Sequence, residues 1–262
     1  MVKNLTEIEN DVFSCKQTDD VALVTLNQNA NEILANNEAK DAFLSTFSTI
    51  DESPKIKGVV ITNSSKYTGD INLKRLITYI SEVLKYDRRD ISIRRFKNSM
   101  AQLVNLFINI TKPTFAAMNG DIGQGFFAIS LACDFRYATP NTTFHFPAVK
   151  QGLPTTGVLA FYLVHHIGLP RSIDIFLTKT SLSAPEAHDL GLLTDVTTDE
   201  ELINRCIEKL NDISQYPSYG ISAMKRLLQP DANEIHKLID RAFEAFILNL
   251  NLIEKKAPHV ST

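Results

Sequence analysis

One stretch of the chain, residues 112–138, constrains the fold more than any other. It reads KPTFAAMNGDIGQGFFAISLACDFRYA: a short apolar run ends at Asn119-Gly120, two further glycines follow, and a second apolar run leads into DFRYA. Short apolar runs bounded by Asn, Gly and Pro are typical of buried strands, and the glycines permit tight backbone turns. The stretch therefore predicts a buried core strand that turns sharply into the next element.

The segments that precede this stretch follow a strand, helix, strand order. Residues 21–26 (VALVTL) and 57–62 (KGVVIT) are rich in β-branched apolar residues and predict two buried strands. Residues 38–50 place apolar side chains at helical spacing. This order predicts a parallel sheet in an α/β fold. Further helices are predicted over residues 73–84, 96–110, 159–167, 171–177, 183–190 (N-cap Ser183) and from 199 onward, and short strands over 113–120, 134–138, 143–146 and 192–196.

Composition narrows the classes of function. The length of 262 residues suits one large domain or a domain with a helical appendage. The net charge of −3 shows no basic excess, which argues against nucleic acid as a main partner. The three cysteines are far apart, which predicts reduced cytoplasmic thiols rather than disulfides or a zinc site. No apolar run reaches the roughly 20 residues that span a bilayer, so no integral membrane segment is expected.

Residues 112–138 closely resemble the central motif of the crotonase (enoyl-CoA hydratase/isomerase) superfamily. In that motif a K-P-x-x-A-A-x-N-G strand runs into a glycine-rich turn and a helix that ends at A-x-x-C-D-x-R. Residues 170–196, PRSIDIFLTKTSLSAPEAHDLGLLTDV, resemble a later segment of the same family at the usual spacing. The resemblance implies a crotonase-like ββα spiral core over residues 1–200 and a C-terminal helical trimerisation region over residues 201–262. It also implies a homotrimer or hexamer.

The resemblance further implies an oxyanion hole, in which two backbone N–H groups hold the enolate-like oxygen of an acyl-CoA or acyl-carrier thioester. Counted from Asn119-Gly120, the second donor falls on Gly125, where a side chain would block the thioester. A simple turn glycine is the alternative interpretation of this position. The first donor belongs to KYTGDIN, residues 66–72, and is the N–H of either Gly69 or Asp70. The start of a helix at the glycine-rich turn would add positive potential toward the same oxygen.

The glutamates with which hydratases of this family activate water have no counterpart here. The first falls on Ala128, three residues beyond Gly125, and the second falls on Ala148 in FHFPAV. The single glutamate of isomerase-type relatives falls on Thr156. Loss of a general base slows such a reaction on the order of 10²–10⁴-fold, so ordinary hydration and ordinary double-bond shift are disfavoured.

Three residues are candidate substitutes for the missing base. Asp121 follows the glycine turn directly, although a solvent-facing turn aspartate is the commoner case. His145 lies on a predicted strand whose alternation points it away from Phe144 and Phe146, and a packed or surface histidine is the alternative. Thr156 could hold a water or a substrate carboxylate, but it needs help to act as a base.

The phosphates of CoA require basic groups in the protein. Arg94, Arg95 and Lys97 are candidates in the basic segment after the first donor loop, and Lys225 resembles a lysine of the family near the C-terminal helices. Each of these residues is also compatible with a solvated helix face. No metal-ligand spacing occurs, so no cofactor is expected beyond CoA, which is part of the substrate.

Two functions are compatible with these features. The first is an enzyme that stabilises the enolate of an acyl thioester and catalyses isomerisation, hydration or decarboxylation with non-standard residues. Decarboxylation fits well, because it needs little beyond an oxyanion hole and room for the departing carboxylate. The second is a crotonase-fold protein that binds a thioester or a partner without catalysis. An unrelated nucleotide-binding fold is disfavoured, since the chain lacks G-x-G-x-x-G.

Overall fold

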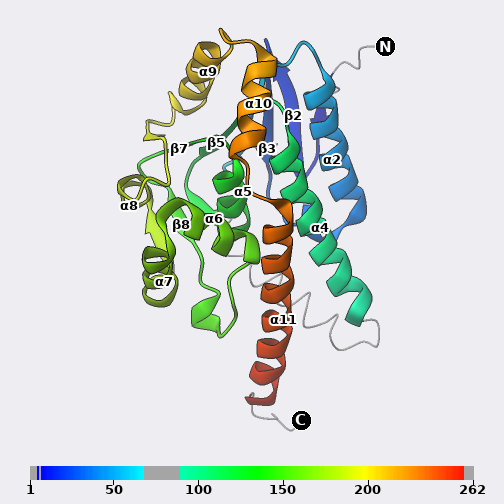
Figure 1. Ribbon diagram of the computed structural model, residues 1–262, viewed down its shortest axis with the longest axis vertical. Helices are drawn as coiled ribbons and strands as arrows, with labels where there is room; N and C mark the ends of the chain where they lie inside the picture. The colour runs from blue at the N-terminus through cyan, green and yellow to red at the C-terminus, as the bar shows by residue number, and fades with distance from the viewer. Residues whose placement is uncertain (1–4, 6, 68–88, 257–262) are drawn as a thin grey trace.

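A seven-stranded sheet forms the centre of the computed structural model, which describes residues 5, 7–67 and 89–256 (Figure 1). Its order is β1-β2-β3-β4-β5-β7-β10, antiparallel from β1 to β3 and parallel from β3 to β10. The parallel part confirms the predicted α/β fold. The strands are β1 Ile8–Glu9, β2 Phe13–Thr18, β3 Val21–Leu26, β4 Gly58–Asn63, β5 Thr114–Met118, β7 Phe135–Ala138 and β10 Asp195–Val196.

Helices cover both faces of this sheet. On one face α9 packs Leu202, Cys206 and Leu210 against β3, β4, β5 and β7, and on the other face α2, α4 and α5 enclose the larger apolar core. Burial on both faces explains why β5 is apolar without alternation. The helices are α1 Glu32–Ala35, α2 Asn37–Glu52, α4 Arg89–Asn109, α5 Gln124–Ala132, α6 Gly157–Ile167, α7 Leu169–Thr178, α8 Ala184–Asp189, α9 Leu202–Ile213, α10 Ser218–Leu228 and α11 Ala232–Lys256, with a 3₁₀ turn at Val149–Gln151.

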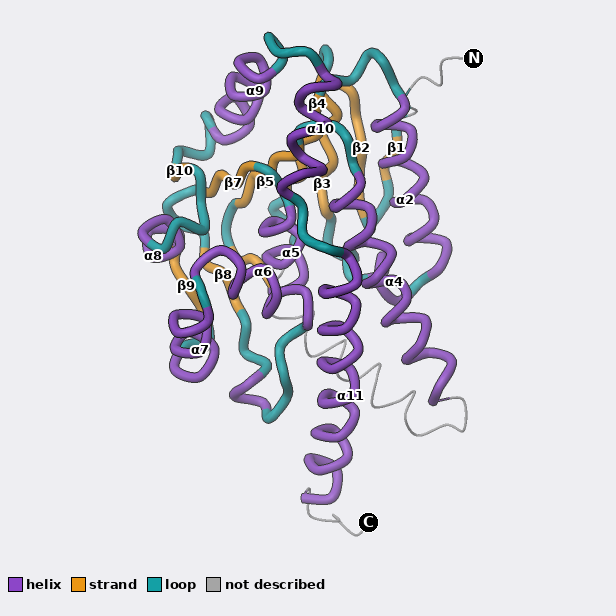
Figure 2. Tube along the Cα trace, viewed as in Figure 1, coloured by secondary structure: helices purple, strands orange, loops and turns teal. Residues whose placement is uncertain are grey.

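A second, three-stranded sheet carries part of the polypeptide that follows β5. It consists of β6 (Asp121–Gly123), β8 (Thr143–His145) and β9 (Ser181–Ser183), with β8 in the middle. The β6 and β8 strands are parallel, and β9 is antiparallel to β8. Figure 2 shows β8 and β9 apart from the strands of the large sheet. The pairing of β6 with β8 fixes the position of residues 121–123, which directly precede α5.

Side-chain caps explain where two of the helices begin. The Asn36 side chain accepts hydrogen bonds from the N–H groups of Glu38 and Ala39 at the start of α2. Ser183 and Glu186 form a reciprocal capping box at the start of α8, which confirms Ser183 as the predicted N-cap. Such caps satisfy backbone N–H groups that have no partner within the helix.

Some predicted elements differ from the structure. The antiparallel strand β2, FSCKQT, was not predicted, because Phe13 and Cys15 are its only apolar residues and its second half is polar. The strand predicted over residues 192–196 is shorter: Leu192 donates its N–H to Ala187 O and closes α8, so only Asp195–Val196 pairs with β7. The helix predicted over residues 73–84 lies outside the described residues.

The last described helix, α11, packs across α6 and α4 and extends past the rest of the described chain (Figure 1). Its contact with α6 is close at Gly157, where a Cβ atom would lie 2.6 Å from Leu238 O. The described part of the chain contains no helix with the length and apolarity required to cross a membrane.

Candidate functional site

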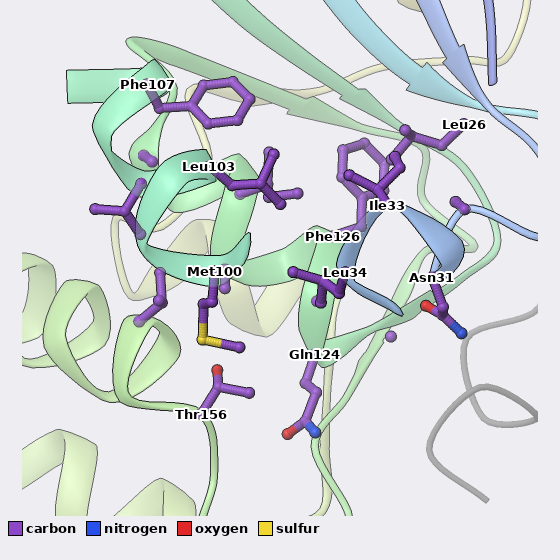
Figure 3. A pocket seen from close by; sticks show the side chains of 18 of the residues that line it. Leu26, Asn31, Ile33, Leu34, Met100, Leu103, Phe107, Gln124, Phe126 and Thr156 are labelled. Atoms are coloured by element: carbon purple, nitrogen blue, oxygen red, sulfur yellow. The ribbon is translucent and has the colours of Figure 1, made fainter. Parts of the chain in front are cut away.

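A cavity of about 110 Å³ lies between α1, α4 and α5, at the carboxyl ends of the parallel strands. Figure 3 shows it extending from Met100 and Thr156 to Leu26 and Ile33. Open α/β sheets bind ligands at this edge. Most of the wall is apolar, and its polar side chains are those of Asn31, Tyr67, Gln124, His145 and Thr156.

Hydrogen bonds between Asn63 and Asn119 join the ends of β4 and β5 at this edge. Asn63 Nδ2 donates to Asn119 O at 2.8 Å, and Asn119 N–H donates to Asn63 Oδ1 at 3.1 Å. Thr139 Oγ1 donates to Asn119 Oδ1 at 3.0 Å. Gly120 then adopts a φ of 72°, in the left-handed region that favours glycine. The Asn-Gly pair thus turns the chain sharply from β5 into β6, which leads to α5.

Gly125, the predicted second oxyanion donor, is the second residue of α5 and lines the cavity. The first N–H groups of a helix have no acceptor within it, and Gly123 at the N-cap supplies no side-chain cap. A Cβ atom at Gly125 would meet no heavy atom within 4 Å. The positive end of the dipole of α5 therefore lies at this wall of the cavity.

Tyr67 is a cavity residue that the sequence analysis did not select. Its ring packs edge-on against Phe126 at 6.0 Å between centroids. Burial raises the pKa of its hydroxyl, while backbone hydrogen bonds with Gly123 and Phe126 oppose the rise. A tyrosine in a turn-rich loop carries no local signal of such a position. The alternative first donors, Gly69 and Asp70, lie outside the described residues.

The three positions at which the family resemblance predicts glutamate lie on cavity walls. Ala128 and Thr156 line the main cavity, while Ala148 lines a second cavity of about 40 Å³. Thr156 and Met100 belong to both walls, so the two cavities are neighbours. Thr156 Oγ1 also caps α6 by accepting the Leu159 N–H at 3.3 Å. No Asp or Glu is among the described residues that line either cavity.

Asp121 and His145 are brought together at the edge of the cavity. His145 Nε2 lies 2.7 Å from Asp121 Oδ1. The alternation predicted for this strand is confirmed, since Phe144 and Phe146 are buried while His145 lines the cavity. Asp121 is exposed, as predicted, but it lies on strand β6 rather than in a turn, and its carboxylate reaches the imidazole. The two residues are 24 positions apart in the sequence, and no local pattern predicts that they pair.

The basic residues predicted to bind CoA phosphates fall into two places. Arg94 and Arg95 are exposed on α4, next to Phe96 of the cavity wall, and Lys97 Nζ lies 2.9 Å from Asp240 Oδ1 of α11. Lys225 is buried on α10 and contacts Asp134. Because Asp134 is bound to Thr114 at the amino end of β5, the structure does not bring Lys225 to the cavity, which lies beyond the carboxyl end.

Curated proteins of known name and solved structures resemble this chain. The 4-chlorobenzoyl coenzyme A dehalogenase-1 of Arthrobacter sp. is 28% identical over 132 residues, 50% of this chain and 48% of that protein. A probable enoyl-CoA hydratase of Mycobacterium tuberculosis is 31% identical over 118 residues, 45% of this chain and 41% of that protein. The matched part therefore spans about half the length of these curated relatives.

The likeness in three dimensions covers more of the chain. The crystal structure of an enoyl-CoA hydratase from Bacillus halodurans matches with a TM-score of 0.77 at 22% identity, covering 93% of this chain and 96% of that one. Because only 22% of the residues are identical, this similarity shows that the two proteins share a fold. The family profile described as enoyl-CoA hydratase/isomerase matches residues 16–250, and this chain therefore belongs to that family and has the crotonase fold.

Proposed function

We propose that this chain binds an acyl-CoA thioester and stabilises its enolate through backbone N–H groups that include that of Gly125. The observation that carries the proposal is the position of Gly125, in the first turn of α5 and facing open space on the cavity wall. The reaction belongs to the hydratase/isomerase class and proceeds without the usual glutamates. Gly125 is the second of the two donors, and the first is the N–H of Gly69 or Asp70, as the family resemblance implies.

The chemistry follows from the charge that develops on the thioester oxygen. When a proton leaves the carbon next to the carbonyl, the electron pair moves toward oxygen, and fixed N–H groups stabilise the resulting negative charge. The apolar wall increases this stabilisation, since water would otherwise screen the interaction. The same N–H groups bind the neutral carbonyl less strongly, so they favour the enolate over the bound thioester.

The cavity wall indicates the kind of acyl group. Leu103, Val104 and Phe107 of α4 and Ile129 and Ala132 of α5 provide apolar surface on facing helices, so a hydrocarbon chain fits there. The CoA phosphates would lie outside the cavity near Arg94, Arg95 and Lys97 on the first turns of α4, where side chains reach solvent.

The test combines binding and turnover. We expect butanoyl-, octanoyl- and dodecanoyl-CoA to raise the melting temperature, while free CoA has a smaller effect. Gly125→Pro removes the N–H donor, and Gly125→Ala places a methyl group in the thioester space. Gly220→Ala is the matched control, because Gly220 also lies in the first turn of a helix and its added Cβ would meet nothing within 4 Å.

Three outcomes decide the proposal. Loss of enolate chemistry in both Gly125 variants, with a folded protein and an unchanged Gly220→Ala control, supports it. Wild-type turnover in Gly125→Pro would exclude Gly125 as an oxyanion donor. Absence of any response to acyl-CoA thioesters in the wild type would exclude the substrate class.

A second candidate function is thioester binding without turnover. It is favoured by the lack of carboxylates among the described residues of both cavities. The same experiment separates the two functions, because a binding protein would show thermal stabilisation by acyl-CoA but no hydration, double-bond shift, decarboxylation or hydrogen exchange at the α-carbon.

We also propose self-association as a homotrimer or hexamer. Helix α10 exposes a group of large apolar side chains that an interface would cover, namely Tyr219, Met224, Leu227 and Leu228. Light scattering on the purified chain tests this, since a monomer at micromolar concentration would contradict it. Leu227→Glu with Leu228→Glu should then shift the assembly to monomers.

A further inference from the structure

The second cavity, of about 40 Å³, adjoins the main one between α4, α6 and α11. The described residues that line both cavities are Phe96, Met100, Gln124 and Thr156. Figure 3 shows Met100, Thr156 and Gln124 at one end of the main cavity. These residues therefore form the boundary between the two cavities.

The wall of the second cavity is mostly apolar. Its described residues beyond the boundary are Ala148, Pro154, Thr155, Gly157, Ala242, Phe243 and Phe246. The polar side chain in this set, that of Thr155, donates a hydrogen bond to Gln124 Oε1 at 3.4 Å. Small residues at positions 148, 157 and 242 leave the space, and the aromatic rings supply apolar surface. Such a wall disfavours charge and suits a hydrocarbon group.

Two contacts hold α11 in place, one on each side of Ala242. At Gly157 of α6 the backbone of α11 is so close that an added Cβ would lie 2.6 Å from Leu238 O, one helical turn before Ala242. Further along α11, Asn249 Nδ2 donates a hydrogen bond to Gly152 O at 2.9 Å. The space at Ala242 therefore lies between two fixed points of the helix.

Helix α4 is also joined to α11 at this cavity. Lys97 Nζ lies 2.9 Å from Asp240 Oδ1, and the rings of Phe96 and Phe243 pack with their centroids 5.6 Å apart. These contacts fix the two helices that form opposite walls. A fixed wall binds a ligand without the entropic cost of ordering its side chains.

The boundary lies beside the proposed oxyanion donor. Gln124 directly precedes Gly125, whose N–H is proposed to hold the thioester oxygen, and both line the main cavity. A branch that leaves the acyl chain close to the carbonyl therefore meets the boundary. The rest of the chain continues toward Phe107, two helical turns from Met100 on α4.

We propose that this site takes acyl thioesters that are branched at the carbon next to the carbonyl, with the longer arm in the main cavity and the shorter arm in the second. The inference rests on the proposed function and names its substrate class. One water needs roughly 10–15 Å³ of such volume, so the second cavity admits an arm of about three carbons. A branched carbon keeps one hydrogen, so the proposed enolate can still form.

Two isomeric ligands test the inference. Octanoyl-CoA and 2-propylpentanoyl-CoA have the same composition and charge and differ only in the branch. Calorimetry measures the affinity of both for the wild type and for Ala242→Leu, whose larger side chain fills the second cavity from α11. We expect the wild type to bind both isomers. Ala242→Leu should weaken binding of the branched isomer by about 10-fold or more and that of the linear isomer by less than about 3-fold.

The control variants separate this effect from folding. Ala245→Leu places the same side chain on α11 at a position that is not among the described residues of either cavity, and it should bind both isomers like the wild type. Ala148→Val fills the second cavity from another segment, in case Ala242→Leu does not fold. Val104→Phe fills the main cavity and should have the reverse effect, weakening the linear isomer more than the branched one.

The outcomes distinguish this inference from the proposed function. If the wild type binds neither isomer, the proposed function fails and the inference fails with it. If the wild type binds the linear isomer alone, the inference is overturned while the proposed function stands. The same conclusion follows if Ala242→Leu and Ala148→Val weaken both isomers equally or leave both unchanged.

Discussion

Lys225 Nζ lies 2.5 Å from Asp134 Oδ2, and this ion pair joins α10 to the residue that precedes β7. Asp134 Oδ2 also accepts hydrogen bonds from the N–H and hydroxyl of Thr114, at 2.7 and 2.9 Å. Lys225 Nζ donates a second hydrogen bond to Lys112 O at 2.6 Å. Both charges are therefore satisfied in a region where the side chains are only 9% and 18% exposed.

Lys225→Met is expected to lower the free energy of unfolding by about 3 kcal/mol, because it leaves the partly buried Asp134 carboxylate without its counter-charge. Denaturant unfolding measures this effect. The control is Arg226→Met, at the exposed neighbouring position, which should change the free energy of unfolding by less than about 0.5 kcal/mol. A folded Lys225→Met protein should keep its affinity for acyl-CoA, and a large loss of affinity would assign Lys225 to the CoA phosphates after all.

Gly157→Ala is expected to destabilise the protein by about 1–3 kcal/mol. The new Cβ would lie 2.6 Å from Leu238 O and 2.7 Å from Ile239 N, and backbone atoms of α11 cannot rotate away. Thermal unfolding compares this variant with Gly220→Ala, whose Cβ has open space and should be neutral or slightly stabilising. Equal melting temperatures for the two variants would mean that α11 does not pack closely on α6.

Val104→Phe is expected to shorten the acyl chain that the cavity accepts. Val104 lines the cavity one helical turn beyond Met100, so a larger ring fills the space toward Phe107. Calorimetry should show a loss of affinity of about 10-fold or more for dodecanoyl-CoA, with little change for butanoyl-CoA. Val164→Phe, at an exposed position of α6, is the control. Equal losses for both acyl chains would show that the chain lies elsewhere.

The carboxyl group of Glu186 is expected to have a pKa well below that of an ordinary glutamate. The hydrogen bond from Lys179, followed by those from the N–H and hydroxyl of Ser183, lowers its pKa from 4.5 to about 2. The pKa of Glu186 is lower in the folded state than in the unfolded state. The hydrogen bonds to its ionised carboxylate therefore stabilise the fold fully above pH 4.5, and this stabilisation is lost as the pH falls toward 2.

The side chain of Glu186 is 46% exposed, so solvent screening limits the gain to about 1 kcal/mol or less. NMR titration of the carboxyl group measures the pKa directly. Lys179→Met should raise it, and Lys209→Met, on α9, should not. A carboxyl that titrates at its ordinary value in the wild type would show that the capping box is open in solution.

Local patterns were sufficient for much of the fold. Apolar β-branched runs predicted β3 and β4, helical spacing predicted α2, and Asn119-Gly120 marked the turn after β5. The strand β2 escaped prediction because it owes its stability to pairing with β3 rather than to its own composition. Local patterns predict the elements that nearby residues favour by themselves. They cannot predict a strand that forms because of contacts with residues distant in the sequence.

The sequence by itself determined the family motif and the glycine at the start of α5, and the family resemblance implies that Ala128, Ala148 and Thr156 stand in place of glutamates. Only the tertiary structure decided which of the remaining side chains meet. It paired His145 with Asp121 across two strands, and it turned Lys225 inward to Asp134. The physical reason is that strand register and helix packing bring distant residues within hydrogen-bonding distance, and neither can be read from the spacing of residues along the chain.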